Sequence, residues 1–60
     1  MKNTELIKLL EGKGWQFKRV KGAHMQLIHP GLSKIITIPY TESELKPATV
    51  RHIKEVAGLN

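Results

Sequence analysis

The stretch that decides the fold is WQFKRVKGAHMQLIH, residues 15–29. Successive side chains of residues 15–20 are expected to alternate, with Trp15, Phe17 and Arg19 on one side and Gln16, Lys18 and Val20 on the other, which is typical of a strand with one buried face. Gly22 can take the positive φ of a tight hairpin, and an apolar run follows it. We therefore predict that residues 15–20 and 24–29 form two antiparallel strands joined by a turn.

A helix is predicted before the hairpin. Asn3 or Thr4 can cap its N-terminus, and Glu5 suits the positive end of the helix dipole. Leucine and isoleucine side chains then recur at helical spacing. Gly12 and Gly14 are expected to end this helix.

A third strand is predicted after the hairpin. Pro30 and Gly31 favour a chain reversal, and residues 34–38 are rich in β-branched side chains. Pro39 is expected to end this strand because it lacks the N–H that a ladder needs.

A last helix is predicted to follow. Pro47 suits a first helical turn, Ser43 or Lys46 can precede it, and Gly58 is placed to end it. The 60 residues therefore form a single domain, 1–60, of the α+β class, in the order helix, three strands, helix. Both helices should cover one face of a three-stranded antiparallel sheet, which leaves the other face open for function.

Two aromatic side chains at the start of the hairpin have two interpretations. Trp15 and Phe17 could form a platform on which bases stack, as in proteins that bind single-stranded nucleic acid. A chain with three aromatic residues needs large side chains to fill its interior. We expect both to pack in the core.

Composition excludes several classes of protein. The chain has no cysteine, which rules out disulfides and thiolate zinc sites. No signal peptide or membrane span is evident, so we expect a cytoplasmic protein. A metal site built from His24, His29 and His52 would lack a neighbouring Asp or Cys ligand, and strand parity separates the first two. We predict neither a metal nor a cofactor.

Charge points toward a polyanionic partner. The net charge is +5, and the span from Gly12 to Thr41 contains no Asp or Glu. Such a balance supports binding of nucleic acid or of an acidic protein. Within this span, parity places His24 on the outer face of its strand, where an imidazole could transfer a proton at a phosphate or could be an ordinary surface residue. His29 more simply pairs with a turn carbonyl, and His52 belongs to a basic helix face.

Short motifs extend along nearly the whole chain. They are ELIKLL at 5–10, GW at 14–15, RVKGAH at 19–24, HP at 29–30, IP at 38–39, LKPATV at 45–50 followed by Ile53, and AGL at 57–59. In this order they resemble the HicA family, small toxin ribonucleases of toxin–antitoxin modules. The resemblance implies a double-stranded-RNA-binding-domain-like fold and cleavage of messenger RNA that depends on one histidine, which corresponds to His24. Many members have Ser or Thr before this histidine, where this chain has Ala23.

The resemblance also implies a partner, a HicB-type antitoxin that covers the histidine, while the toxin alone is expected to be a monomer. Our hypothesis is a metal-independent endoribonuclease in which His24 moves the proton. The residues expected to hold RNA are Lys18, Arg19, Lys21, Gly22 and Lys34. Two alternatives stay open: a non-catalytic RNA-binding module of the same fold, and a protein whose partner is an acidic protein and not RNA.

Overall fold

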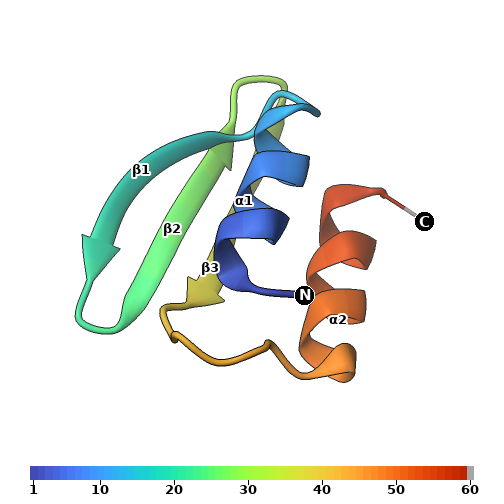
Figure 1. Ribbon diagram of the computed structural model, residues 1–60. Coiled ribbons are helices and arrows are strands. Elements are labelled where there is room, and N and C mark those ends of the chain that lie inside the picture. Colours follow the sequence, from blue (N-terminus) through green and yellow to red (C-terminus); the bar gives the residue numbers. More distant parts are fainter. Residues whose placement is uncertain (60) are drawn as a thin grey trace.

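The computed structural model describes residues 1–59 and has the predicted order of elements (Figure 1). They are α1 (Asn3–Glu11), β1 (Gln16–Lys21), β2 (His24–His29), β3 (Leu32–Pro39) and α2 (Pro47–Ala57). β2 lies between β1 and β3, and both strand pairs are antiparallel. Both helices lie on the same side of the sheet (Figure 1), which confirms the predicted α-β-β-β-α architecture. Within residues 1–59, neither helix has the length and hydropathy needed to span a bilayer.

The two faces of the sheet differ in what covers them. The helix face packs against α1 and α2, and its buried side chains are Met25, Leu27, Ile36 and Ile38. They form one core with Leu6 and Leu10 of α1 and Ile53 of α2. The open face carries the alternate side chains, among them His24 and Gln26 of β2, because successive residues of a strand point to opposite sides. The structure thus confirms that His24 points outward and is exposed.

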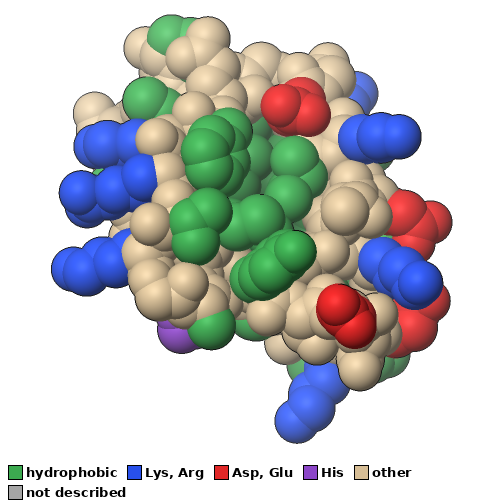
Figure 2. Space-filling view, turned by 60° about the vertical axis from the view of Figure 1, so that its left-hand side comes forward, with side chains coloured by type: hydrophobic (Ala, Val, Ile, Leu, Met, Phe, Trp, Pro, Cys, Tyr) green, Lys and Arg blue, Asp and Glu red, His purple; other side chains and the backbone are tan. Residues whose placement is uncertain are grey.

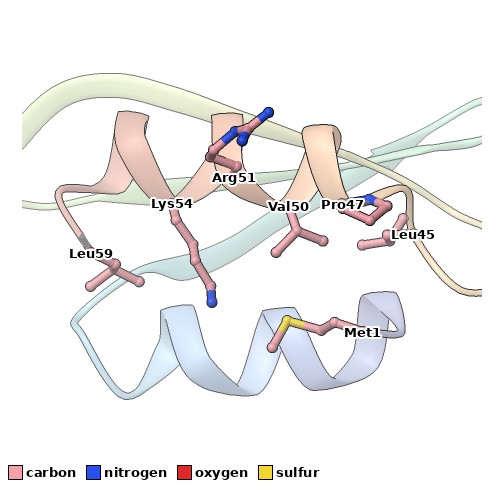
Figure 3. Close-up of a pocket in the computed structure, with 7 residues that line it drawn as sticks. All are labelled: Met1, Leu45, Pro47, Val50, Arg51, Lys54 and Leu59. Atoms are coloured by element: carbon pink, nitrogen blue, oxygen red, sulfur yellow. The ribbon is translucent and has the colours of Figure 1, made fainter.

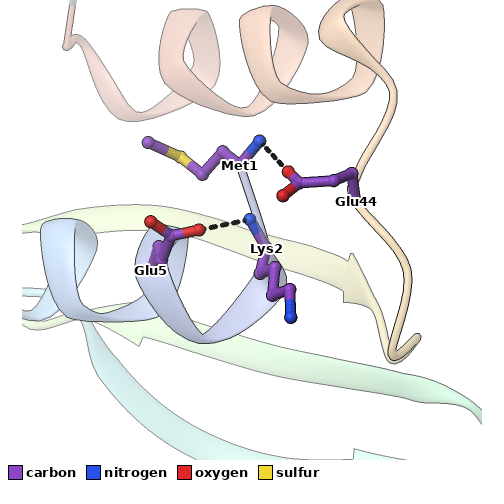
Figure 4. A network of polar contacts seen from close by, with 4 residues as sticks. All are labelled: Met1, Lys2, Glu5 and Glu44. Atoms are coloured by element: carbon purple, nitrogen blue, oxygen red, sulfur yellow. Dashed lines mark hydrogen bonds and ion pairs between the residues drawn. The ribbon is translucent and has the colours of Figure 1, made fainter.

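The start of α1 differs from the prediction. Asn3 lies inside the helix and is only 3% exposed, because its side-chain amide donates to the carbonyl of Pro39 at 3.4 Å. Lys2 occupies the N-cap position, and its backbone N–H donates to the carboxylate of Glu5 at 2.8 Å (Figure 4). The prediction of a cap at Asn3 or Thr4 is therefore wrong. The Asn3 side chain instead connects α1 to the end of β3.

β1 contains a bulge that the alternation in the sequence did not reveal. Phe17 lies opposite Leu27 and Val20 lies opposite Met25, with the register shift between Phe17 and Arg19. Because opposite residues share a face, Phe17 and Val20 both point to the helix face, and Arg19 points to the open face. Predicting Trp15, Phe17 and Arg19 on one side was therefore wrong.

The core prediction for the two aromatic residues is half correct. Trp15 is 2% exposed and belongs to the core, whereas Phe17 is 51% exposed. Phe17 is on the correct face of the sheet, but β1 is the edge strand and curves away from the helices (Figure 1). No side chain of β1 is buried.

The C-terminal half is close to the prediction. β3 is longer than residues 34–38, because it pairs with β2 through Pro39 and the Tyr40 N–H then donates to the Ala23 carbonyl at 2.7 Å. Lys46 is the N-cap of α2, Pro47 lies in its first turn, and Gly58 ends it with φ +75°.

The connection before α2 is held to the start of the chain. The Leu45 N–H donates to the Met1 carbonyl at 2.9 Å, and the Met1 ammonium pairs with Glu44 (Figure 4). A hydrogen bond from that ammonium, together with its charge, lowers the pKa of the Glu44 carboxyl below its ordinary value. Leu45 itself is buried in the core, so the connection is anchored by both polar and apolar contacts.

Candidate functional site

A hollow of about 560 Å³ surrounds His24 on the open face of the sheet. Its lining residues are Lys21, Gly22, His24, Gln26 and Thr37. They come from all three strands and from the turn between β1 and β2. Gly22 makes that turn with φ +61°, which an L side chain rarely adopts. The hairpin therefore ends directly beside the imidazole.

Lys21 and His24 are direct neighbours across the hairpin. They are opposite each other in the β1–β2 register, and Pro39 is opposite His24 on β3. Opposite Cα atoms in an antiparallel pair are about 4.5–5.5 Å apart. Both side chains are exposed. The ammonium group of Lys21 and the imidazole can therefore contact the same phosphodiester group.

Arg19 and Gln26 form the next row of this face. The Arg19 Nε–H donates to the Gln26 side-chain oxygen at 2.8 Å, and the two residues are opposite each other in the register. This bond uses one of the five N–H groups of the guanidinium and leaves four for a ligand. Strand parity places Gln26 on the same face as His24, but its partner Arg19 could not be predicted from the sequence, because the bulge in β1 decides which residue lies opposite Gln26.

The remaining basic residues of the hypothesis lie at different places. Lys18 is the residue skipped by the register shift, and it is exposed at the free edge of β1. Lys34 lies five residues before Pro39 on β3, about 16 Å along the strand from the row of His24. The structure therefore brings Arg19, Lys21 and Gly22 together with His24, and it does not bring Lys34 to this hollow.

The other two histidines have different surroundings. His29 Nδ1 accepts the Gly31 N–H at 2.9 Å, and its Nε2 is 3.2 Å from the Lys13 carbonyl, to which it donates in the neutral tautomer. The ring also meets Trp15 edge-on, with centroids 5.3 Å apart. His29 thus pairs with a turn carbonyl, as predicted, and His52 is exposed on α2. Among residues 1–59, no three His, Asp or Glu side chains lie close enough to hold a metal ion.

A second hollow, of about 480 Å³, lies between the chain start and α2 (Figure 3). Its lining is mainly apolar, with Arg51 and Lys54 at its rim. Its lining residues include none of the histidines and none of the residues predicted to bind RNA. Of these two hollows, the one around His24 therefore holds the histidine.

Comparisons with known proteins agree with this fold. The sequence profile described as "HicA toxin of bacterial toxin-antitoxin" matches residues 4–59. A solved structure described as "HicA3 and HicB3 toxin-antitoxin complex" contains a chain that is 39% identical, with a TM-score of 0.81. That similarity covers 100% of this chain and 97% of the other. No curated protein sequence matches significantly. A profile that spans nearly all of the chain, together with full-length structural similarity, shows that the chain belongs to the HicA toxin family.

Proposed function

We propose that the protein is the toxin of a toxin–antitoxin pair and an endoribonuclease that cleaves messenger RNA without a metal ion, with His24 as the proton-transfer group. One observation carries this proposal. His24 is an exposed imidazole in a hollow on the open face, directly opposite Lys21, in a span of thirty residues without a carboxylate side chain. With messenger RNA as substrate, the protein works in the cytoplasm.

The reaction uses the ribose 2′-hydroxyl of the RNA itself. His24 in its neutral form accepts the 2′-hydroxyl proton on a ring nitrogen while that oxygen attacks the adjacent phosphorus. The bond from phosphorus to the 5′-oxygen then breaks, which leaves a 2′,3′-cyclic phosphate and a free 5′-hydroxyl. The 5′-oxygen takes its proton from water, because the imidazole has just gained a proton from the nucleophile and does not serve both roles in a single step. The hydroxide formed from that water then takes the proton from His24, which restores the neutral imidazole.

The cations beside His24 stabilise the transition state. Attack on the phosphorus concentrates negative charge on the non-bridging oxygens, and fixed cations at that position lower the barrier. Lys21 supplies a compact charge beside His24, and Arg19, held by Gln26, supplies a planar fork of donors that fits a phosphate. Lys18 contacts the RNA backbone further out.

A HicB-type antitoxin neutralises the enzyme. The similar HicA3 chain was solved in a complex with HicB3. A basic site that binds RNA also attracts an acidic protein surface, so an antitoxin at this site excludes the substrate by competition. The toxin alone is a monomer and enters a larger assembly with its antitoxin.

The test compares the wild type with His24→Ala for cleavage of a single-stranded RNA in the presence of EDTA. His52→Ala is the matched control, because it removes another exposed histidine that lies on α2. We expect His24→Ala to lose at least about 100-fold in rate and His52→Ala to stay near the wild type. Circular dichroism of all three proteins checks that the fold is retained.

Three other results of this experiment would contradict the proposal. Equal loss in both variants, or equal cleavage by all three proteins, would remove His24 from the mechanism. Loss of the wild-type cleavage with EDTA would contradict a metal-independent reaction. Salt-sensitive RNA binding without cleavage by the wild type would show an RNA-binding module instead.

A further inference from the structure

The proposed mechanism makes no use of an apolar strip on the helix face of β1. Phe17 and Val20 are 51% and 54% exposed, although they lie opposite the buried Leu27 and Met25. They stay exposed because β1 is the edge strand and curves away from the helices (Figure 1). Large exposed apolar side chains that are clustered in this way mark interaction sites more often than isolated ones do.

Figure 2 shows this side of the molecule, with β1 brought forward. Hydrophobic side chains gather in the centre of the view, with a column of Lys and Arg on one side and mixed Lys and Glu side chains on the other. Tyr40 belongs to the same face, since it continues the alternation of Ile36 and Ile38, and it is also exposed. The strip is therefore apolar in its middle and charged at its borders.

β1 also presents a free edge. Within residues 1–59 it pairs only with β2, so the backbone groups on its other side have no strand partner. Such an edge can accept an extended segment from another protein through main-chain hydrogen bonds. Side chains of an added strand alternate between the two faces of the sheet. Those on the helix face would meet Phe17 and Val20, and those on the open face would meet Arg19 and Lys21.

We infer that the antitoxin docks on this edge with an extended segment in which apolar and acidic side chains alternate. The apolar side chains cover Phe17 and Val20, and the acidic ones pair with Arg19 and Lys21. This inference rests on the proposed function in one respect, the identity of the partner as a HicB-type antitoxin. It adds which surface is bound and which chemistry the bound segment carries.

The antitoxin must cover a large share of so small a toxin. A stable interface takes about 800 Å² from each partner, and the whole accessible surface of residues 1–59 is 4178 Å². The antitoxin must therefore cover about a fifth of the toxin. The β1 edge has apolar groups at its centre and cations at its border, as expected of an interface with an acidic protein.

Docking here blocks the enzyme without requiring contact with the imidazole. A strand added to β1 runs beside Lys21, at the mouth of the hollow around His24. Its acidic side chains would occupy the cations that hold the RNA backbone. The apolar anchors are thus needed for inhibition and not for cleavage, which separates the two activities in an experiment.

The experiment measures both activities of Phe17→Ser and Val20→Ser. Ile35→Ser is the matched control, because Ile35 is 54% exposed, as Val20 is, but lies on β3 at the open face opposite Ile28. Affinity for the purified HicB-type antitoxin of the same module is measured by calorimetry, and RNA cleavage is measured with and without antitoxin. Val20→Thr is a second variant that keeps the β-branched shape if serine disturbs the strand.

We expect each substitution in the strip to weaken antitoxin binding at least about tenfold while free-toxin cleavage changes less than about twofold. Ile35→Ser should bind and cleave as the wild type does. Unchanged antitoxin affinity in Phe17→Ser and Val20→Ser would overturn the inference, as would an equal loss in Ile35→Ser. A toxin dimer that these substitutions dissolve, with antitoxin affinity unchanged, would assign the strip to a second copy.

Failure of the proposed function gives a different result. If the wild type does not cleave RNA, the ribonuclease proposal fails, yet the calorimetric titration still decides where the antitoxin binds. If the wild type cleaves and His24→Ala does not, but the strip variants are inhibited normally, the docking inference alone fails.

Discussion

His24 and His29 are five residues apart on β2 and point to opposite faces of the sheet. His24 has an exposed side chain beside Lys21, whereas His29 is half-buried and joined to two turns. Its Nε2 reaches the turn before β1 and its Nδ1 reaches the turn before β3. The same residue type is thus exposed beside a lysine at one position and joins two turns at the other.

His29→Ala should destabilise the protein by about 1–3 kcal/mol, because the Lys13 carbonyl and the Gly31 N–H lose their partner and Trp15 loses an edge-on contact. Urea denaturation followed by Trp15 fluorescence measures the change. At a temperature where the variant is folded, its RNA cleavage should stay close to that of the wild type. A stable variant that has lost cleavage would instead give His29 a chemical role.

Gly14 is constrained by His29 as well as by its own backbone. Its φ is +96°, and a Cβ added there would lie 2.8 Å from His29 Nε2. Gly58 has φ +75° with no heavy atom within 4 Å of the added Cβ. Gly58→Ala should therefore cost only the backbone strain, about 1–2 kcal/mol. Gly14→Ala should cost more, since the imidazole must also move, and a melting temperature equal to that of Gly58→Ala would contradict this reading.

At the scale of elements, the bulge in β1 separates two kinds of surface on one short strand. Without it, Phe17 and Arg19 would share a face, as the alternation in the sequence predicts. The extra residue at Lys18 places Phe17 with Val20 on the helix face and Arg19 on the open face beside Gln26. One strand thus carries an apolar strip on one side and the cations of the site on the other.

α1 contributes the centre of the core, and its two neighbouring leucines allow a direct comparison. Leu10 is fully buried, whereas Leu9 is half-buried. Leu10→Ala should cost about 2–5 kcal/mol. This is most of the stability of a 60-residue domain, which is about 3–9 kcal/mol. Leu9→Ala should cost less than half as much. Urea midpoints measured on both variants check the order, and equal midpoints would show that α1 does not pack as described.

At the scale of the whole molecule, the proposed site predicts that the position of each cation affects RNA binding more than the net charge does. The net charge is +5, but cations lie on α1 and α2 as well as on β1. If net charge alone drove RNA binding, every lysine would count equally. Because Arg19 and Lys21 cluster on the open face, we expect these two cations to contribute more to RNA binding than the lysines on the helices do.

Lys21→Gln and Lys8→Gln remove the same charge from opposite sides of the sheet. Lys8 is exposed on α1, which covers the helix face. Lys21→Gln should reduce the salt dependence of single-stranded RNA binding by about 0.7 in the slope of log K against log salt. Lys8→Gln should change it far less. Filter binding at several salt concentrations measures both slopes, and equal slopes would indicate diffuse electrostatic attraction without a defined site.

Local patterns in the sequence correctly predicted the features that depend on a few neighbouring residues. Pro47 and Gly58 bounded α2, Gly22 made the hairpin turn, and strand parity turned His24 outward. The error at Asn3 arose because its partner, the Pro39 carbonyl, is 36 residues away. Nothing in the neighbouring sequence shows whether the Asn3 side chain caps its own helix or donates to a carbonyl on a distant strand.

The sequence by itself determined the order of elements, the basic central span and the face of β2 that bears His24, because periodicity, turn residues and charge act over a few neighbouring positions. Only the tertiary structure decided the register of β1, the Arg19 to Gln26 bond, the distance of Lys34 from the site and the exposure of Phe17. Each of these depends on which residue lies opposite which across the sheet and on how far the helices reach over it. Contacts between distant segments set both quantities, and one extra residue in an edge strand is enough to change them.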